Sequence, residues 1–291
     1  TITEYVNTGG TRSYYNNYSL NATYGASVVS KQYNVSNISG NGGVNNNLAH
    51  NIQFSNTSGV ASTCGTYGIA GTTYTLSSSI SNDSVSGNGC IIVSAANITI
   101  DCNGYSITST SNNSGVYSNQ VNTTVKNCNI SMGSGGNAGA MGIEFASGAN
   151  NGLILGNNGT GNMGYGIDVR SNNNNLTSNN FNVTGSGTGI YFQGALNNTL
   201  TNNIITSNSG AGIFLSAGNN NNILTNNTVV SMSSIAIYIY LNSNNNILIG
   251  NNGTSYDAAY GNTAGINILT CSNNILTNNY GYSNRANYGG I

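Results

Sequence analysis

Two acidic residues, Glu144 and Asp168, are the pair in this sequence best placed to do chemistry together. The chain has only six acidic residues in 291, and these two fall at the same position of neighbouring repeats, with Arg170 two residues further on. A carboxyl pair about 5 Å apart is what a retaining glycosidase uses. The alternative is that two unrelated surface residues share a column, and the scarcity of other acidic groups favours it. We therefore predict no catalytic residues and no enzyme activity.

The sequence offers little that would hold a metal ion or a cofactor. His50 is the only histidine, and the four methionines do not cluster. The glycines near Gly135 are not followed by the lysine and helix of a phosphate-binding loop. Asp101 and Lys126 are expected to form a local ion pair. We predict no metal site and no cofactor.

Five cysteines indicate an oxidising compartment. Cys64 and Cys90 are 26 residues apart, and so are Cys102 and Cys128. This separation is about one repeat, and residues one turn apart in a stacked structure lie within disulfide reach. We predict the disulfides Cys64–Cys90 and Cys102–Cys128, with Cys271 unpaired; buried free thiols are the alternative.

Asn-x-Ser/Thr sequons are frequent, and they mark candidate N-glycosylation sites in an exported protein. In a chain so rich in Asn, Ser and Thr, many arise by chance, and each also fits a simple polar turn. The candidate sites are Asn17, Asn21, Asn34, Asn37, Asn56, Asn82, Asn97, Asn112, Asn122, Asn129, Asn158, Asn175, Asn182, Asn197, Asn226 and Asn252.

Two short phrases repeat along the chain and decide its architecture. An Asn-Asn pair follows a Leu/Ile/Thr run at steps of 22 to 27 residues, and a Gly-Ile phrase runs in phase with it. Alternating apolar residues within the phrases predict short strands, and a repeat of this length predicts a solenoid. We expect an all-β, parallel β-helix of about eight or nine coils over residues 61–291, preceded by an N-terminal extension, residues 1–60.

Low charge and high Asn content have one explanation in such a stack. Charged residues make up 4% of the chain, whereas Asn occurs 60 times. Coils in register place equivalent side chains above one another, where like charges repel but amides both donate and accept hydrogen bonds. Columns of Asn are therefore expected to bond along the stack.

The segments Asn97–Ile107 and Asn122–Ile130, followed by the two repeated phrases, resemble the right-handed parallel β-helix repeat proteins. That group lies within the pectin-lyase-like fold and includes NosD-like periplasmic proteins and archaeal surface proteins. The resemblance covers about residues 62–280 and implies a right-handed β-helix. It says little about function, because the group contains lyases, hydrolases, adhesins and structural proteins.

One outward column is expected to carry an exposed aromatic strip, made by Tyr191, Phe214 and Tyr238. Such a strip binds sugar rings or a protein neighbour, unless a loop covers it. The net charge of −1 gives no footprint for nucleic acid, and no apolar run is long enough for membrane insertion.

We predict a non-catalytic, extracellular structural glycoprotein at the cell surface, whose partners are its own copies and covalent N-glycans. A chain that begins at Thr1 is interpreted as a mature protein whose leader has been removed. An uncapped last coil favours head-to-tail stacking into a filament or surface layer. A strand at Thr1–Val6, with Ile2, Tyr5 and Val6 as contacts, is a candidate for donation to a neighbour. The alternative is a polysaccharide-binding or polysaccharide-cleaving β-helix, an adhesin or a glycosidase or lyase.

Overall fold

The computed structural model describes residues 17–24, 27–34, 58–81, 87–133, 139–256 and 264–284. The chain divides into two compact units, Thr1–Thr57 and Ser58–Ile291. In the first, β1 (Asn17–Tyr24) and β2 (Ser27–Asn34) pair as an antiparallel hairpin. Among the described residues, no helix has the length and apolar character that crossing a membrane requires.

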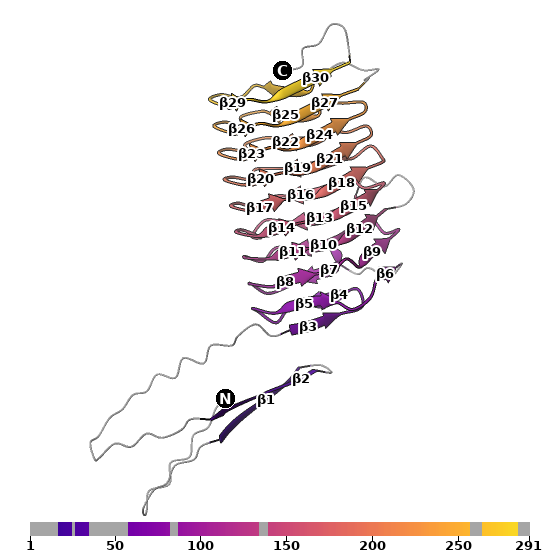
Figure 1. Ribbon diagram of the computed structural model, residues 1–291, viewed down its shortest axis with the longest axis vertical. Coiled ribbons are helices and arrows are strands. Elements are labelled where there is room, and N and C mark those ends of the chain that lie inside the picture. The colour runs from indigo at the N-terminus through magenta and orange to yellow at the C-terminus, as the bar shows by residue number, and fades with distance from the viewer. Residues whose placement is uncertain are drawn as a thin grey trace, which may run out of the picture. The chain divides into compact units, whose positions relative to one another are not determined.

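The second unit is a parallel β-helix built from three sheets (Figure 1). Sheet 1 contains β4 (Gly65–Tyr67), β7 (Gly89–Val93), β10 (Ser114–Ser118), β13 (Met141–Phe145), β16 (Tyr165–Val169), β19 (Thr188–Phe192), β22 (Ile213–Leu215), β25 (Ile237–Tyr240) and β28 (Ile266–Leu269). Sheet 2 contains β3 (Ser58–Ala61), β5 (Thr73–Leu76), β8 (Thr99–Asp101), β11 (Thr124–Lys126), β14 (Leu153–Leu155), β17 (Asn175–Thr177), β20 (Thr199–Thr201), β23 (Ile223–Thr225), β26 (Ile247–Ile249) and β29 (Ile275–Thr277). Sheet 3 contains β6 (Ile80–Ser81), β9 (Ser106–Ser109), β12 (Asn129–Met132), β15 (Asn158–Gly161), β18 (Asn180–Val183), β21 (Ile204–Ser207), β24 (Thr228–Ser231), β27 (Asn252–Ser255) and β30 (Tyr280–Ser283). Each coil passes through sheets 1, 2 and 3 in turn, and the predicted parallel β-helix is confirmed.

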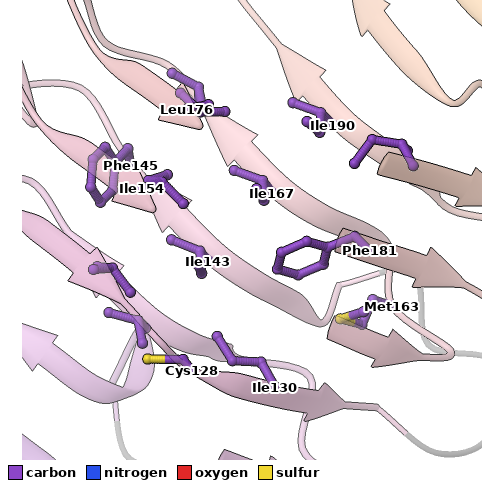
Figure 2. Close-up of a cluster of buried hydrophobic side chains, with 14 of the residues drawn as sticks. Cys128, Ile130, Ile143, Phe145, Ile154, Met163, Ile167, Leu176, Phe181 and Ile190 are labelled. Atoms are coloured by element: carbon purple, nitrogen blue, oxygen red, sulfur yellow. The ribbon is translucent and has the colours of Figure 1, made fainter. Parts of the chain in front are cut away.

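The core is a stack of apolar side chains that face inward from all three sheets (Figure 2). The Ile of each Gly-Ile phrase is directly above its equivalent, as Ile143, Ile167 and Ile190 show, and all three are fully buried. Phe145 and Phe181 are among the largest fully buried side chains of the interior. Burying one such side chain contributes about 1.5–3 kcal/mol, so each added coil extends one continuous core.

Glycine precedes the core isoleucine because there is no room for a side chain. A Cβ on Gly166 would lie 2.5 Å from the carbonyl oxygen of Gly189 in the next coil and 2.9 Å from the ring of Phe181. Gly166 and Ile167 therefore both face the core, and the strict alternation of the strand is interrupted here.

The Asn-Asn pairs lie at the corners between sheets 2 and 3, where two successive positions have different roles. The first position adopts the left-handed conformation; it is Asn202 (φ 55°) or Asn226 (φ 52°) in two coils, and Gly156, Ser178 or Gly250 in others. The second is buried: the backbone N–H and Nδ2 of Asn227 donate to Oδ1 of Asn251, at 3.0 and 2.9 Å. Nδ2 of Asn227 also donates to the carbonyl oxygen of Leu200, at 3.0 Å.

Two such asparagine ladders run along the stack, as the sequence predicted. They consist of Asn157, Asn179, Asn203, Asn227, Asn251 and Asn279, and of Asn174, Asn198, Asn222, Asn246 and Asn274. A buried polar group left without a partner costs about 1–3 kcal/mol, so each amide depends on the coil beside it.

Disulfides join Cys64 to Cys90 and Cys102 to Cys128, in the coils before the ladders begin. Cys271 is a free, half-buried thiol near the other end of the stack. The Asp101–Lys126 ion pair is also present, at 3.1 Å.

Candidate functional site

Within the described part of the chain, the outward face of sheet 1 contains the residues whose side chains are best suited to chemistry or to ligand binding. Parallel pairing aligns Glu144 with Asp168, Asp168 with Tyr191, and Tyr191 with Phe214. Phe214 in turn aligns with Tyr238. The acidic pair and the aromatic strip are therefore neighbouring segments of one column.

Asp168 is the centre of the acidic part of this column. Its side chain is wholly buried, and Oδ2 accepts a hydrogen bond from Nη2 of Arg170 at 2.7 Å. Its other oxygen, Oδ1, has no hydrogen-bond partner among the described residues. Glu144 is engaged elsewhere, because its Oε2 accepts a hydrogen bond from Ser114 Oγ at 2.7 Å.

Burial raises the pKa of Asp168 from 3.8 to about 6. Arg170 opposes this shift by stabilising the carboxylate, whereas the negative charge of Glu144 adds to it. A carboxyl group that is enclosed by protein cannot contact a substrate in this conformation. The geometry therefore does not supply the accessible carboxyl pair that glycoside hydrolysis needs.

The aromatic part of the face is a continuous ladder of five rings. Tyr165 stacks on Tyr191 with ring centroids 4.5 Å apart, and Phe214 stacks on Tyr238 at 4.9 Å. Tyr191 meets Phe214 edge to face at 5.6 Å, and Tyr240 extends the ladder beyond Tyr238 at 5.3 Å. All five side chains are half-buried, so each still presents part of its ring to solvent.

Tyr165 and Tyr240 were not among the predicted ladder residues. A strict period of two from the core residue Ile167 places Tyr165 inside, but the two inward neighbours Gly166 and Ile167 shift it outward. The recurring Gly before Ile is the feature of the sequence that could have predicted the outward position of Tyr165.

The sequons of the β-helix lie on its outside. Asn97, Asn112, Asn122, Asn158, Asn175, Asn182, Asn197, Asn226 and Asn252 are exposed, and Asn129 is half-buried. Asn17, Asn21 and Asn34 belong to the β1–β2 hairpin, for which only the backbone is described. The predicted sites Asn37, Asn56 and Asn82 and the predicted contacts Ile2, Tyr5 and Val6 lie outside the described residues, as does His50.

Stacked coils, inward apolar columns and asparagine corners together define a parallel β-helix protein. The family model for the right-handed beta helix region matches residues 69–229, more than half of the chain. The chain belongs to this family, and its coils are right-handed. Comparison with curated proteins gives no match.

Proposed function

We propose that this protein is a non-catalytic structural protein outside the cell that assembles with its own copies. Two disulfides support an oxidising, extracellular environment. The exposed sequons support N-glycosylation as part of the same proposal, because covalent glycans would supply the solubility that charges do not. The resemblance to NosD-like and archaeal surface proteins of the pectin-lyase-like fold supports a place at the cell surface.

The observation that carries the proposal is the contrast between the two halves of the β-helix. Within the described residues, no charged side chain occurs at 171–256 or at 264–284. Of fourteen exposed large apolar side chains among the described residues, ten lie in these two stretches: Ile204, Ile223, Met232, Leu241, Ile249, Tyr256, Leu269, Ile275, Tyr280 and Tyr282. Depletion of charge together with clustered apolar exposure is characteristic of an interface.

The outer edge of β28, β29 and β30 supports head-to-tail stacking as one mode of assembly. No described residue pairs with these three strands on that side. The asparagine ladders reach Asn274 and Asn279, whose own backbone N–H groups have no acceptor among the described residues. An edge of this kind is a template for another chain, and a heterologous contact that does not close propagates into a filament.

Electron microscopy of the purified protein tests this proposal directly. We expect filaments or ordered sheets whose subunits repeat along the β-helix axis. Uniform single particles at high protein concentration would contradict self-assembly. Donation of the Thr1–Val6 strand is tested by deleting residues 1–6, which should shorten or abolish such filaments if that strand bridges neighbours.

Glycan binding is the second candidate function, and the five-ring ladder of sheet 1 favours it. The half-buried rings present apolar edges beside the hydroxyl groups of the tyrosines, and such mixed apolar and polar surface suits sugar rings. The test is isothermal titration with neutral and acidic oligosaccharides, comparing Tyr191→Ala and Tyr238→Ala with the control Tyr105→Ala, which removes an exposed ring away from the ladder. Selective loss of binding in the ladder variants would support this function, and no binding by the wild type would exclude it for the sugars tested.

A further inference from the structure

The outward face of sheet 2 changes character along the stack. In β8 and β11 its two outward columns carry Thr, Asp101 and Lys126, in β14 they carry Leu153 and Leu155, and in β17 and β20 they are polar again. In β23, β26 and β29 one of these columns is isoleucine throughout, and the other has isoleucine in β26 between two threonines. We call these four residues the isoleucine face: Ile223, Ile247, Ile249 and Ile275.

The isoleucine face is a contiguous exposed patch. Ile223, Ile247 and Ile275 are aligned in one column, and Ile249 is in the parallel column two residues away, between Thr225 and Thr277. Ile223, Ile249 and Ile275 are 38%, 39% and 56% exposed. Apolar residues exposed singly are normal, but adjacent ones on a flat sheet indicate a surface that is covered in the assembled protein.

We propose that the isoleucine face packs against the same face of a second copy of this chain. Adjacent strands set the rows of the face about 4.8 Å apart, so rows of another parallel β-helix with the same rise can interdigitate with it over several coils. A second copy of this chain has the same spacing, because it is the same β-helix. The face carries no charge, so the contact buries no unpaired ion and requires no oppositely charged partner.

The contact is lateral, with two sheets face to face at about 10 Å, and it is distinct from stacking at the edge of β28–β30. A two-fold axis through the face makes the contact isologous, so it closes as a pair of β-helices. This inference rests on the proposed self-assembly and identifies the side-by-side contact within it.

The chain itself indicates which substitutions the fold accepts. Lys126 occupies the column of Ile249 in an earlier coil, and Thr199 occupies the column of Ile223. Ile249→Lys should therefore fold, and the double variant Ile223→Thr/Ile249→Thr copies residues already present at these slots. Thr124→Lys is the matched control, because Thr124 lies in the column of Ile223 but outside the face.

Sedimentation velocity over a concentration series measures the effect. We expect the lateral association constant of the wild type to fall at least about tenfold in Ile249→Lys and in the double Thr variant, and to be unchanged in Thr124→Lys. A wild type that stays monomeric overturns both this inference and the proposed self-assembly. A wild type that associates, with face variants that associate equally well, overturns the isoleucine face and leaves the proposed function standing.

Discussion

The backbone N–H of Cys128 donates a hydrogen bond to the side-chain oxygen of Asn157, one coil further along, at 3.0 Å. It links a cysteine of the second disulfide to the first residue of an asparagine ladder. Before Asn157 the coils are linked by the disulfide Cys64–Cys90 in sheet 1 and by Cys102–Cys128 at the corner after sheet 2, and from Asn157 onward that corner is linked by stacked amides. In the described β-helix, disulfides therefore link the coils of β4–β6, β7–β9 and β10–β12, and asparagine ladders link the later coils.

Removing one amide from the middle of a ladder should destabilise the β-helix. In Asn203→Ala, the backbone N–H and Nδ2 of Asn179 lose their acceptor, and the carbonyl oxygen of Leu176 loses its donor. We expect the free energy of unfolding to fall by about 2–4 kcal/mol. Urea denaturation followed by circular dichroism measures it. The matched control is Asn202→Gly, because Gly156 and Gly250 already occupy that left-handed corner slot; a similar loss in both variants would contradict the ladder's role.

Reducing the disulfides should loosen the first coils and spare the last ones. The 26-residue separation between Cys102 and Cys128 predicts a loss of about 3 kcal/mol when the bond is removed. Because each coil contacts only its neighbours, the loss should be local. Hydrogen exchange of Cys102→Ser/Cys128→Ser is expected to accelerate in β5–β12 and to stay slow in β20–β27, with Cys271→Ser as the neutral control. Equal acceleration of hydrogen exchange in all the coils would contradict the prediction that the disulfide stabilises only the coils near it.

Stability should decline as the pH rises through the interval from about 4 to 6. The pKa of Asp168 is raised from 3.8 to about 6 in the folded protein, so the folded state binds the proton more tightly than the unfolded state in that interval. The contribution of Asp168 to the free energy of unfolding that is lost between low and neutral pH is about 2–3 kcal/mol. Asp101 acts in the opposite direction but at lower pH. Burial raises its pKa, while hydrogen bonds from Asn127 and Asn103 and the ion pair with Lys126 outweigh burial and lower it.

The urea midpoint of wild type and Asp168→Asn, measured at pH 4.5 and 7.5, separates the contribution of Asp168 from the others. The wild-type midpoint is expected to be higher at pH 4.5, and the variant should show a smaller difference between the two conditions. An equal pH dependence in both proteins would show that Asp168 is not responsible.

A methyl group at Gly166 should disrupt the stack, whereas one at Gly65 should not. The Cβ of Gly166→Ala would meet a carbonyl oxygen and the Phe181 ring, and overpacking of this kind costs about 1–3 kcal/mol or more. A Cβ on Gly65, in the same sheet, meets no atom within 4 Å. Thermal melts of the two variants provide the comparison, and equal melting temperatures would be incompatible with the tight approach of neighbouring coils at Gly166.

The sequence predicted the architecture because in-register stacking imposes a period on every coil. The Gly-Ile phrases gave the inward column that contains Ile167, and the Asn-Asn phrases gave the corners that contain Asn227. The spacing of the cysteines predicted the two disulfides, since one coil brings residues 26 apart together.

The details of the outward face could not be obtained in this way. The burial of Asp168 depends on how neighbouring side chains cover it, which a repeat pattern does not specify. The outward position of Tyr165 depends on two successive inward residues, Gly166 and Ile167, which a period of two does not anticipate. The isoleucine face is visible only once the register of β23, β26 and β29 shows that its members are adjacent.

Self-association through the described β-helix surface at 171–256 and 264–284 is the central claim, and static light scattering of the purified wild-type chain tests it most directly. The weight-average mass is expected to rise steadily with protein concentration. Because the described part of the associating surface has no charged group, that rise should persist when sodium chloride is increased from about 0.1 M to about 1 M. A mass that stays at 29.9 kDa for the polypeptide, plus any attached glycan, at every concentration and salt level would contradict the claim.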